Sequence, residues 1–517
     1  MKLSIFKNEP FTDFSNPKNK LAMQNALLKI KKELGHEYPI VIGGKEIRVE
    51  EKIISINPSS TKEVIGVFQK GTIENGNLAI ETAAQTFESW KNVPVEKRVS
   101  YLLKAAKIMR KRKHEFSAAL IYEVGKNWAE ADGDTAEAID FLEFYSREML
   151  RLGAPQKLTK IQNEKNELQY IPLGVGVVVP PWNFALAILV GMTVASIVAG
   201  NTVVLKPSSD SMYVGWKFFN FMREVGLPDG VINFITGPGG TVGEEMVKHP
   251  KTRYIAFTGS KDVGIRINEL AAIVQPSQKW LKRVVAEMGG KDSIVIDDKT
   301  DLDAAAQATV ASAFGFQGQK CSAASRAIVH EKVYDKFLEL IVDKTEKLVV
   351  ASPTQQNANL GPVINKSSMN KILSYIQKGI DEGGKLLIGG SQASEEGFFV
   401  QPTIIANVKP KSTISQEEIF GPVLAVIKAK NFDDALEIAN NTEYGLTGGV
   451  WTNNRKNIER AKKEFHVGNF YINRKITGAL VGAHPFGGFN MSGTDSKSGG
   501  KDYLLLFTQA KTITEKI

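Results

Sequence analysis

Short apolar runs alternate with longer amphipathic segments through the middle of the chain. Residues 174–180, 201–207, 230–236 and 253–259 are rich in valine, isoleucine and phenylalanine, and each ends beside a glycine or a proline. Residues 212–226 repeat apolar positions every three or four residues, as an amphipathic helix does. Buried strands that alternate with helices predict a mostly parallel sheet with helices on both faces. The fold class indicated is a doubly wound α/β fold.

The pattern changes on both sides of this region. Residues 72–152 carry the helical period over long stretches, whereas residues 154–165 are polar and lack it, which favours an extended connector. Beyond residue 283, strands and helices alternate again and predict a second α/β unit. Residues 502–517 are apolar and alternating, and they predict an exposed strand able to cap a partner subunit.

Composition excludes several classes of protein. A chain of 517 residues is too long for one core. The single cysteine excludes an internal disulfide and a cysteine-based zinc site, and the six histidines show no ligand spacing, so we expect no metal. The net charge of +9 is spread over interleaved basic and acidic residues, and the densest basic run, 110–114, lies on a predicted helix. We therefore expect no nucleic-acid partner.

No membrane association is expected. Residues 184–200 are apolar but short of the ~20 residues that a spanning helix needs, so they predict a buried helix. Residues 1–14 are too polar for a signal peptide. We expect a cytoplasmic protein that acts on a small-molecule substrate.

Residues 257–264 are a candidate phosphate-binding turn. A strand runs into Gly259 and Ser260 and then into a helix, and a helix N-terminus beside a hydroxyl suits a pyrophosphate. Gly259 and Gly264 have the spacing of a P-loop, but the lysine and serine or threonine that nucleoside triphosphate hydrolysis requires do not follow. An ordinary turn between a strand and a helix explains the same residues.

A second strand end carries Lys206 and Ser209. Ligands of doubly wound sheets bind at the carboxyl ends of the strands, so Lys206 is a candidate partner for a ribose hydroxyl. The usual GxGxxG dinucleotide fingerprint does not occur after any predicted strand.

Cys321 is a candidate nucleophile. Nearby glycines give the backbone room to present the thiol, and Ser322 leaves space for a substrate, although a buried and inert cysteine is the alternative. Glu287, followed by two glycines, is either a general base of raised pKa or an exposed glutamate. Asn183, after an apolar strand, either stabilises an oxyanion or caps the next helix.

Seven motifs, taken in order, resemble the aldehyde dehydrogenase family: PPWNF, NTVVLKPSS, FTGSKDVG, AEMGGKD, GQKCSAASR, EEIFGP and HPFGGFNMSG. The resemblance covers the chain from residue 40 to its end. It implies a Rossmann-like NAD(P)-binding domain of residues 1–150 and 169–285 and a catalytic α/β domain of residues 286–485. It also implies a small β arm of residues 151–168 and 495–517 that joins subunits into a homo-oligomer, a dimer or larger.

The same resemblance implies roles for single residues. Cys321 would attack an aldehyde, the Asn183 amide and the N–H of Cys321 would hold the oxyanion, and Glu287 would activate the water that hydrolyses the thioester. The cofactor would be NAD, and Ser209, which stands where many NAD-preferring members carry a glutamate, leaves NADP open. The implied cofactor-binding residues are Trp182, Lys206, Ser209, Gly259, Ser260, Gly264, Glu418 and Phe420.

A narrower resemblance is to the members that oxidise L-glutamate γ-semialdehyde to L-glutamate in proline degradation. It rests on KNEPFTDFS, EAIDFLEFYSREM and above all TGALVGAHPFGGFNMSGTDSKSGGKDYL. It implies that Ser322 and the N–H groups of Gly478 and Ala479 hold the α-carboxylate, with Phe184 and Phe486 beside the aliphatic stem. A proline dehydrogenase would be a transient partner.

Two alternatives stay open. An aldehyde dehydrogenase for another small aldehyde would not need the TGAL loop. A cysteine acyltransferase or hydrolase would use Cys321 and Glu287 without any nicotinamide. Two departures, PWNFA for PWNFP and the lack of a second cysteine after Cys321, leave the catalytic assignment unchanged.

Overall fold

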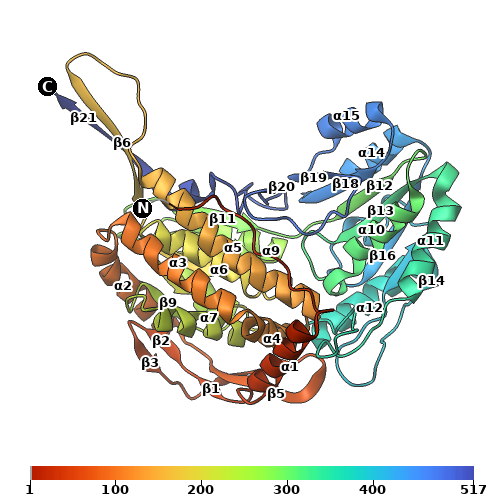
Figure 1. Ribbon diagram of the computed structural model, residues 1–517, viewed down its shortest axis with the longest axis horizontal. Coiled ribbons are helices and arrows are strands. Elements are labelled where there is room, and N and C mark those ends of the chain that lie inside the picture. Colours follow the sequence, from red (N-terminus) through yellow and green to blue (C-terminus); the bar gives the residue numbers. More distant parts are fainter. Residues whose placement is uncertain (1–2) are drawn as a thin grey trace.

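A computed structural model describes residues 3–517, so Met1 and Lys2, which begin the predicted cofactor-binding domain, lie outside the described residues. Two seven-stranded sheets form the body of the molecule, and a two-stranded arm projects from it (Figure 1). The α/β fold predicted from the sequence is confirmed.

The first sheet has the strand order β11-β10-β7-β8-β9-β2-β3. Its five strands from β11 to β9 are parallel, and β2 and β3 extend the sheet antiparallel at one edge. The predicted strands at 174–180, 201–207, 230–236 and 253–259 correspond to β7 to β10. The strands are β2 (Ile40–Ile42), β3 (Lys45–Ile47), β7 (Val175–Val179), β8 (Thr202–Leu205), β9 (Ile232–Phe234), β10 (Thr252–Thr258) and β11 (Arg283–Glu287).

Helices cover both faces of this sheet because its strands carry apolar residues on both sides. Val175 and Val177 pack with α2, α8 and α9, whereas Val178 packs with the helices of the other face. These helices are α2 (Ile73–Trp90), α8 (Glu244–Lys248) and α9 (Lys261–Ala272), and on the other face α3 (Val95–Lys111), α4 (Lys113–Val124), α5 (Trp128–Gly153), α6 (Ala187–Val198) and α7 (Met212–Val225), with α1 (Pro17–Lys31) outside α4.

Helix α6 is the apolar segment expected to be a buried helix, and this prediction is confirmed. Every residue of α6 except Ile188 is buried, against α5, α3 and the sheet. Among the helices of residues 3–517, none is long and apolar enough to cross a membrane.

The second sheet has the order β14-β15-β16-β13-β12-β18-β19, parallel except for β14. Helices α10 and α11 cover one face and α12 and α14 the other. The strands are β12 (Asp292–Ile296), β13 (Ala324–His330), β14 (Lys385–Ile388), β15 (Thr403–Ala406), β16 (Val423–Ala429), β18 (Thr447–Trp451) and β19 (Asn469–Ile472). The helices are α10 (Leu302–Phe314), α11 (Tyr334–Glu346), α12 (Lys366–Asp381), α13 (Thr413–Gln416), α14 (Phe432–Asn440) and α15 (Arg455–Glu464).

The arm consists of β6 (Glu164–Pro172) and β21 (Thr508–Lys516), which pair antiparallel over their whole length and extend away from the body (Figure 1). The expected exposed strand of residues 502–517 is confirmed only for Thr508–Lys516. Residues 503–507 form a 3₁₀ turn instead, because Tyr503 and Phe507 are buried in the core of the first sheet. The domain boundaries stay a prediction. Smaller pairings join β1 (Glu37–Tyr38), β4 (Lys52–Asn57) and β5 (Ser60–Gln69), and β17 (Tyr444–Gly445) with β20 (Phe489–Asn490).

Candidate active site

The carboxyl ends of the first sheet meet the amino ends of the second. Strand β11 ends at Glu287, and only four residues separate it from β12. Strands β7, β8 and β10 end just before Asn183, Lys206 and Gly259, because successive parallel strands present the same ends at one edge. Cys321 lies between α10 and β13, on the side of the second sheet that faces this edge.

The loop before Cys321 is strained. Phe316 and Gln317 have φ angles of 49° and 54°, a region that residues other than glycine rarely adopt. Contacts fix this conformation: the ring of Phe316 is fully buried, and the Gln317 amide donates to the carbonyls of Gly125 (3.1 Å) and Pro362 (2.7 Å). Such strain persists only where the surroundings impose it, and here it places Cys321 partly exposed at the junction of two cavities.

Cys321 lines both cavities. One is a groove along the strand ends, and the other is an apolar pocket on the other side of the thiol. Thr258, the last residue of β10, is the other residue common to both. Two ligands of different size can therefore approach the same sulfur from two sides.

The thiol lies in a weakly solvated, anionic environment. Burial raises the pKa of Cys321 well above its usual value, and the carboxyls of Asp292, Glu287 and Glu418 raise it further. The backbone N–H of Ser322 acts in the opposite direction. The thiolate form is the nucleophile, so the free protein holds Cys321 in its unreactive thiol form.

Asn183 lies next to this loop and is buried. Its side-chain amide donates one hydrogen bond to the carbonyl of Gln319 (3.0 Å). An amide nitrogen carries two hydrogens, so a second donor is left for an oxygen bound near Cys321.

Glu287 is paired with Thr258 in the register of β10 and β11, and it lines the pocket. One carboxylate oxygen accepts a hydrogen bond from the Ser496 hydroxyl. The other is buried and has no hydrogen-bond partner within residues 3–517. Burial raises the pKa of Glu287 to about 8, and the Ser496 hydrogen bonds oppose that rise. A carboxyl with such a pKa is suited to exchange a proton near neutral pH.

The groove is lined by seven of the eight residues implied as cofactor ligands: Trp182, Lys206, Ser209, Gly259, Ser260, Glu418 and Phe420. Gly264 does not line it. That glycine lies one turn into α9, packed against Met288 so closely that a side chain would collide with its sulfur. The lack of a side chain at Gly264 allows α9 to pack closely on β11, and this packing explains the glycine without a ligand contact.

Several polar groups of the groove are left without partners. The Lys206 side chain is buried and makes no hydrogen bond within the described residues, and burial lowers its pKa to about 8. The Ser260 hydroxyl stands at the start of α9 without capping it. Glu418 uses one oxygen to accept from the N–H of Gly290 (3.0 Å). These groups fit a ligand that offers hydroxyls and phosphates.

Two aromatic side chains of the groove pack against each other. Phe420, whose φ is 59°, packs edge-on against Trp182 with 5.5 Å between ring centroids. Both residues line the groove, as Cys321 does.

The pocket is lined by all five residues implied as substrate ligands: Phe184, Ser322, Gly478, Ala479 and Phe486. Behind Phe184, the ammonium of Lys126 lies over the ring at 4.0 Å and forms a fully buried ion pair with Asp134 (2.8 Å). That contact fixes the ring in one place.

Sequence reasoning missed Glu137, a residue of α5 that also lines the pocket. Its carboxylate accepts no hydrogen bond from the described residues, and burial and Asp134 raise its pKa to about 8. The only signal in the sequence is a carboxylate among otherwise buried positions of a helix, 136 and 138, and that signal is weak. Ser496, whose hydroxyl donates to Glu287, was missed too.

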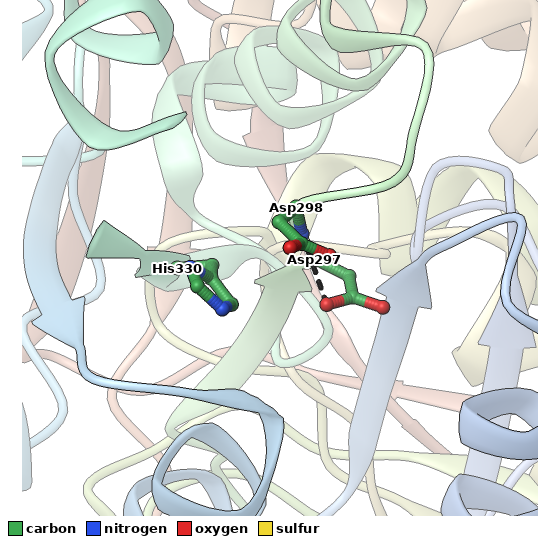
Figure 2. Close-up of side chains that lie close together, drawn as sticks. All are labelled: Asp297, Asp298 and His330. Carbon is green, nitrogen blue, oxygen red and sulfur yellow. Dashed lines mark hydrogen bonds between the residues drawn. The ribbon is translucent and has the colours of Figure 1, made fainter. Parts of the chain in front are cut away.

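One group of potential metal ligands occurs among the described residues. Asp297, Asp298 and His330 lie at the ends of β12 and β13, with one ligand atom of each within 4.8 Å of the others (Figure 2). Protein donors already bind Asp297: the Thr452 hydroxyl (2.6 Å) and the Asn457 amide (2.8 Å). The group is a hydrogen-bonded strand end, and the expectation of no metal stays a prediction.

A cysteine with a buried carboxyl and an amide donor, set between a groove along strand ends and a small apolar pocket, is the arrangement expected of a cysteine-dependent enzyme that binds two ligands beside one thiol. Residues 47–513 match the family model "Aldehyde dehydrogenase family". The chain belongs to the aldehyde dehydrogenase family.

Similar proteins point the same way. The chain is 56% identical to 1-pyrroline-5-carboxylate dehydrogenase of Anoxybacillus flavithermus and 55% identical to 1-pyrroline-5-carboxylate dehydrogenase 2 of Bacillus subtilis, each over 99% of both chains. A crystal structure of 1-pyrroline-5-carboxylate dehydrogenase from Thermus with bound NAD matches with a TM-score of 0.98 at 48% identity over all of both chains. Proline utilization A from Bdellovibrio bacteriovorus matches with a TM-score of 0.98 at 45% identity, over 54% of that chain.

Proposed function

We propose that this protein oxidises L-glutamate γ-semialdehyde, in equilibrium with 1-pyrroline-5-carboxylate, to L-glutamate with NAD. The observation that carries the proposal is the composition of the pocket. Ser322, Gly478 and Ala479 offer donors for a carboxylate, and Glu137 offers a carboxyl for an ammonium. The remaining lining is largely aromatic and aliphatic, as a short carbon chain requires. Together these groups match an α-amino acid that carries an aldehyde.

In the first step Cys321 loses its thiol proton to solvent and the thiolate attacks the aldehyde carbon, so that a thiohemiacetal forms. The Asn183 amide and the backbone N–H of Cys321 stabilise the oxyanion, since both are fixed donors in a weakly solvated site. NAD, when bound in the groove, would supply the acceptor for the hydride that this carbon loses. Cys321 then carries a thioester.

Glu287 completes the reaction by taking a proton from the water that attacks the thioester. Its unpartnered carboxylate oxygen is free to accept that proton, and its pKa of about 8 makes it a stronger base than an ordinary carboxylate while part of it stays ionised near neutral pH. L-Glutamate leaves and the thiol is restored.

The groove residues described above would hold NAD. Lys206 is positioned for a ribose hydroxyl at the end of β8, Ser260 for the pyrophosphate at the start of α9, and Glu418 for the nicotinamide ribose. Ser209 is exposed beside Lys206 and carries no negative charge to repel a 2′-phosphate, so we propose that NADP is a slower alternative.

One assay tests the proposal. Initial rates of nicotinamide reduction are measured with 1-pyrroline-5-carboxylate, succinate semialdehyde and butyraldehyde, each with NAD and with NADP. We expect the highest kcat/KM for 1-pyrroline-5-carboxylate with NAD. A preference for another aldehyde would favour the first alternative, and no reduced nicotinamide with any aldehyde would favour an acyltransferase or hydrolase.

We further propose a homo-oligomer built through the arm, located in the cytoplasm. Strand β21 pairs with β6 alone within residues 3–517, and its other edge is exposed. A proline dehydrogenase as transient partner is supported only by the likeness to proline utilization A. Light scattering of the protein with and without residues 508–517 tests the role of the arm.

A further inference from the structure

The loop that carries Gly478 and Ala479 is held from behind by Arg474, which follows β19. The Arg474 guanidinium donates through Nε to the carbonyl of Lys475 (3.0 Å). Its Nη2 donates to the carbonyl of Thr477 (3.1 Å) and, at a longer 3.4 Å, to that of Gly478. One planar side chain thus binds three carbonyl oxygens of a loop of irregular backbone.

These bonds determine where the N–H groups of the loop point. In a trans peptide the C=O and the N–H of one unit point in opposite directions. The carbonyls of Thr477 and Gly478 are turned toward Arg474, so the N–H groups of Gly478 and Ala479 are turned away from it. Neither N–H has an acceptor among the described residues, and both residues line the pocket. Gly478, with φ of 78°, allows the left-handed turn that brings two successive N–H groups together as an anion-binding concavity.

Two neighbouring side chains keep this arrangement rigid. The Arg474 guanidinium stacks over the ring of Tyr471 at 4.7 Å, and Tyr471 packs edge-on against His484 at 6.2 Å between ring centroids. His484 Nδ1 accepts from the N–H of Leu480 (3.1 Å), which fixes the far end of the loop. The loop is therefore fixed through its carbonyls at one end and through an N–H at the other.

We propose that Arg474 is a positioning residue for the carboxylate subsite. It does not line the pocket, but it orients the N–H groups of Gly478 and Ala479 and so sets the preference for an aldehyde with an α-carboxylate. The inference rests on the proposed function and deepens it. It assigns substrate selectivity to a side chain that touches no substrate.

The test compares the wild type with Arg474→Gln, Arg474→Lys and the control Arg455→Gln, whose side chain is exposed on α15. Each is assayed with 1-pyrroline-5-carboxylate and with butyraldehyde, which lacks the carboxylate. For Arg474→Gln we expect KM for 1-pyrroline-5-carboxylate to rise about 10- to 100-fold, the range for weakened hydrogen bonds to a charged group, with kcat little changed. Butyraldehyde turnover, which also reports a folded site, stays near that of the wild type.

Arg474→Lys should restore only part of the preference, because an ammonium lacks the planar fork that reaches several carbonyls. Competitive inhibition by L-glutamate should weaken in Arg474→Gln by the same factor as KM rises. The inference would be overturned if Arg474→Gln kept the wild-type preference for 1-pyrroline-5-carboxylate over butyraldehyde. It would also be overturned if activity fell equally with both aldehydes. Lack of preference for 1-pyrroline-5-carboxylate in the wild type would instead overturn the proposed function itself, and the inference with it.

Discussion

The groove and the pocket share Cys321 but are built in different ways. The groove is formed mainly by short stretches at successive strand ends, 179–183, 206–210 and 257–260, together with residues 418–420 before β16. The pocket combines residues of α5 and α6 with the loop 478–486, which contributes backbone N–H groups as well as side chains. One cavity follows from sheet topology, and the other from separate segments that tertiary folding brings together.

The difference in construction indicates which cavity sets the selectivity for the aldehyde. Strand ends of a parallel sheet offer the same kind of ligand site in many proteins, so the groove defines a class of cofactor. The aldehyde is chosen by separate polar groups in an apolar wall, where the loss of one partner leaves another group unpaired. Substitutions in the pocket should therefore change selectivity more sharply than substitutions in the groove.

The largest effect is expected at the point that the two cavities share. Cys321→Ala removes the nucleophile, so oxidation of every aldehyde should fall by about 10⁴-fold or more. NAD affinity, measured by calorimetry, should stay near the wild-type value because the groove is intact. Ser325→Ala, four residues further along, serves as the control with near-normal turnover. Appreciable aldehyde oxidation by Cys321→Ala would contradict the proposed mechanism.

In the pocket, Glu137→Gln should reduce kcat/KM for 1-pyrroline-5-carboxylate by about 10- to 100-fold, because a substrate ammonium, which favours the ionised form of Glu137, would lose its charged partner. Butyraldehyde carries no ammonium, and its kcat/KM should change little. Glu143→Gln, on the same helix but paired with Arg147 at the surface, is the matched control. Equal losses for both aldehydes would show that Glu137 is structural.

The same contrast explains how much the sequence could predict. Strands β7 to β10, the buried helix α6 and the exposed tail strand follow from local periodicity, which depends on neighbours in the chain. Lys206 and Ser260 were predictable because each follows its own strand directly. Glu137 and Arg474 were not, since a buried carboxyl in α5 or an arginine that binds carbonyls looks like any surface charge until the fold brings its partners near.

Gly264 is a residue that the motif implied as a cofactor ligand but that does not line the groove. The spacing from Gly259 suggested a phosphate loop, but spacing does not distinguish a glycine that touches a ligand from one that lets a helix approach a strand. Here the helix packs against Met288. The resemblance to a family carried the remaining assignments.

In the groove, Lys206→Met should raise KM for NAD by about 10-fold while KM for the aldehyde stays constant, because one hydrogen bond to a hydroxyl is lost. Lys248→Met, an exposed substitution on α8, is the control.

The thermal stability of the free protein should increase in Lys206→Met, although its affinity for NAD falls. Burial lowers the pKa of Lys206 from 10.5 to about 8, so at pH 7 the folded protein bears the cost of a buried charge. That cost fades as pH rises from about 8 toward 10.5.

Lys206→Met should therefore raise the Tm of the free protein at pH 7, with a smaller gain at pH 9.5. A lower Tm at pH 7, or an equal rise in KM for NAD and for the aldehyde, would contradict a role of Lys206 that is confined to the groove.

The smallest effect is a shift in pH dependence on the pocket side. The Ser496 hydroxyl donates to the ionised carboxylate of Glu287 and lowers its pKa against the effect of burial. Ser496→Ala should raise that pKa above about 8, by about half a unit to one unit. Because only the ionised carboxylate accepts the proton from water, thioester hydrolysis at pH 7 should slow by about 3- to 10-fold. At pH 9.5 the variant and the wild type should converge.

The first burst of nicotinamide reduction, which precedes hydrolysis, should be unchanged, and so should KM for NAD. Ser492→Ala is the matched control, since that hydroxyl accepts from the N–H of Gly445 and does not touch Glu287. The measurement is the pH profile of kcat from pH 6 to pH 10, together with the burst amplitude. An identical pH profile of kcat in Ser496→Ala and the wild type would mean that a group other than Glu287 is the base in hydrolysis. The assignment of Cys321 as the nucleophile would not be affected.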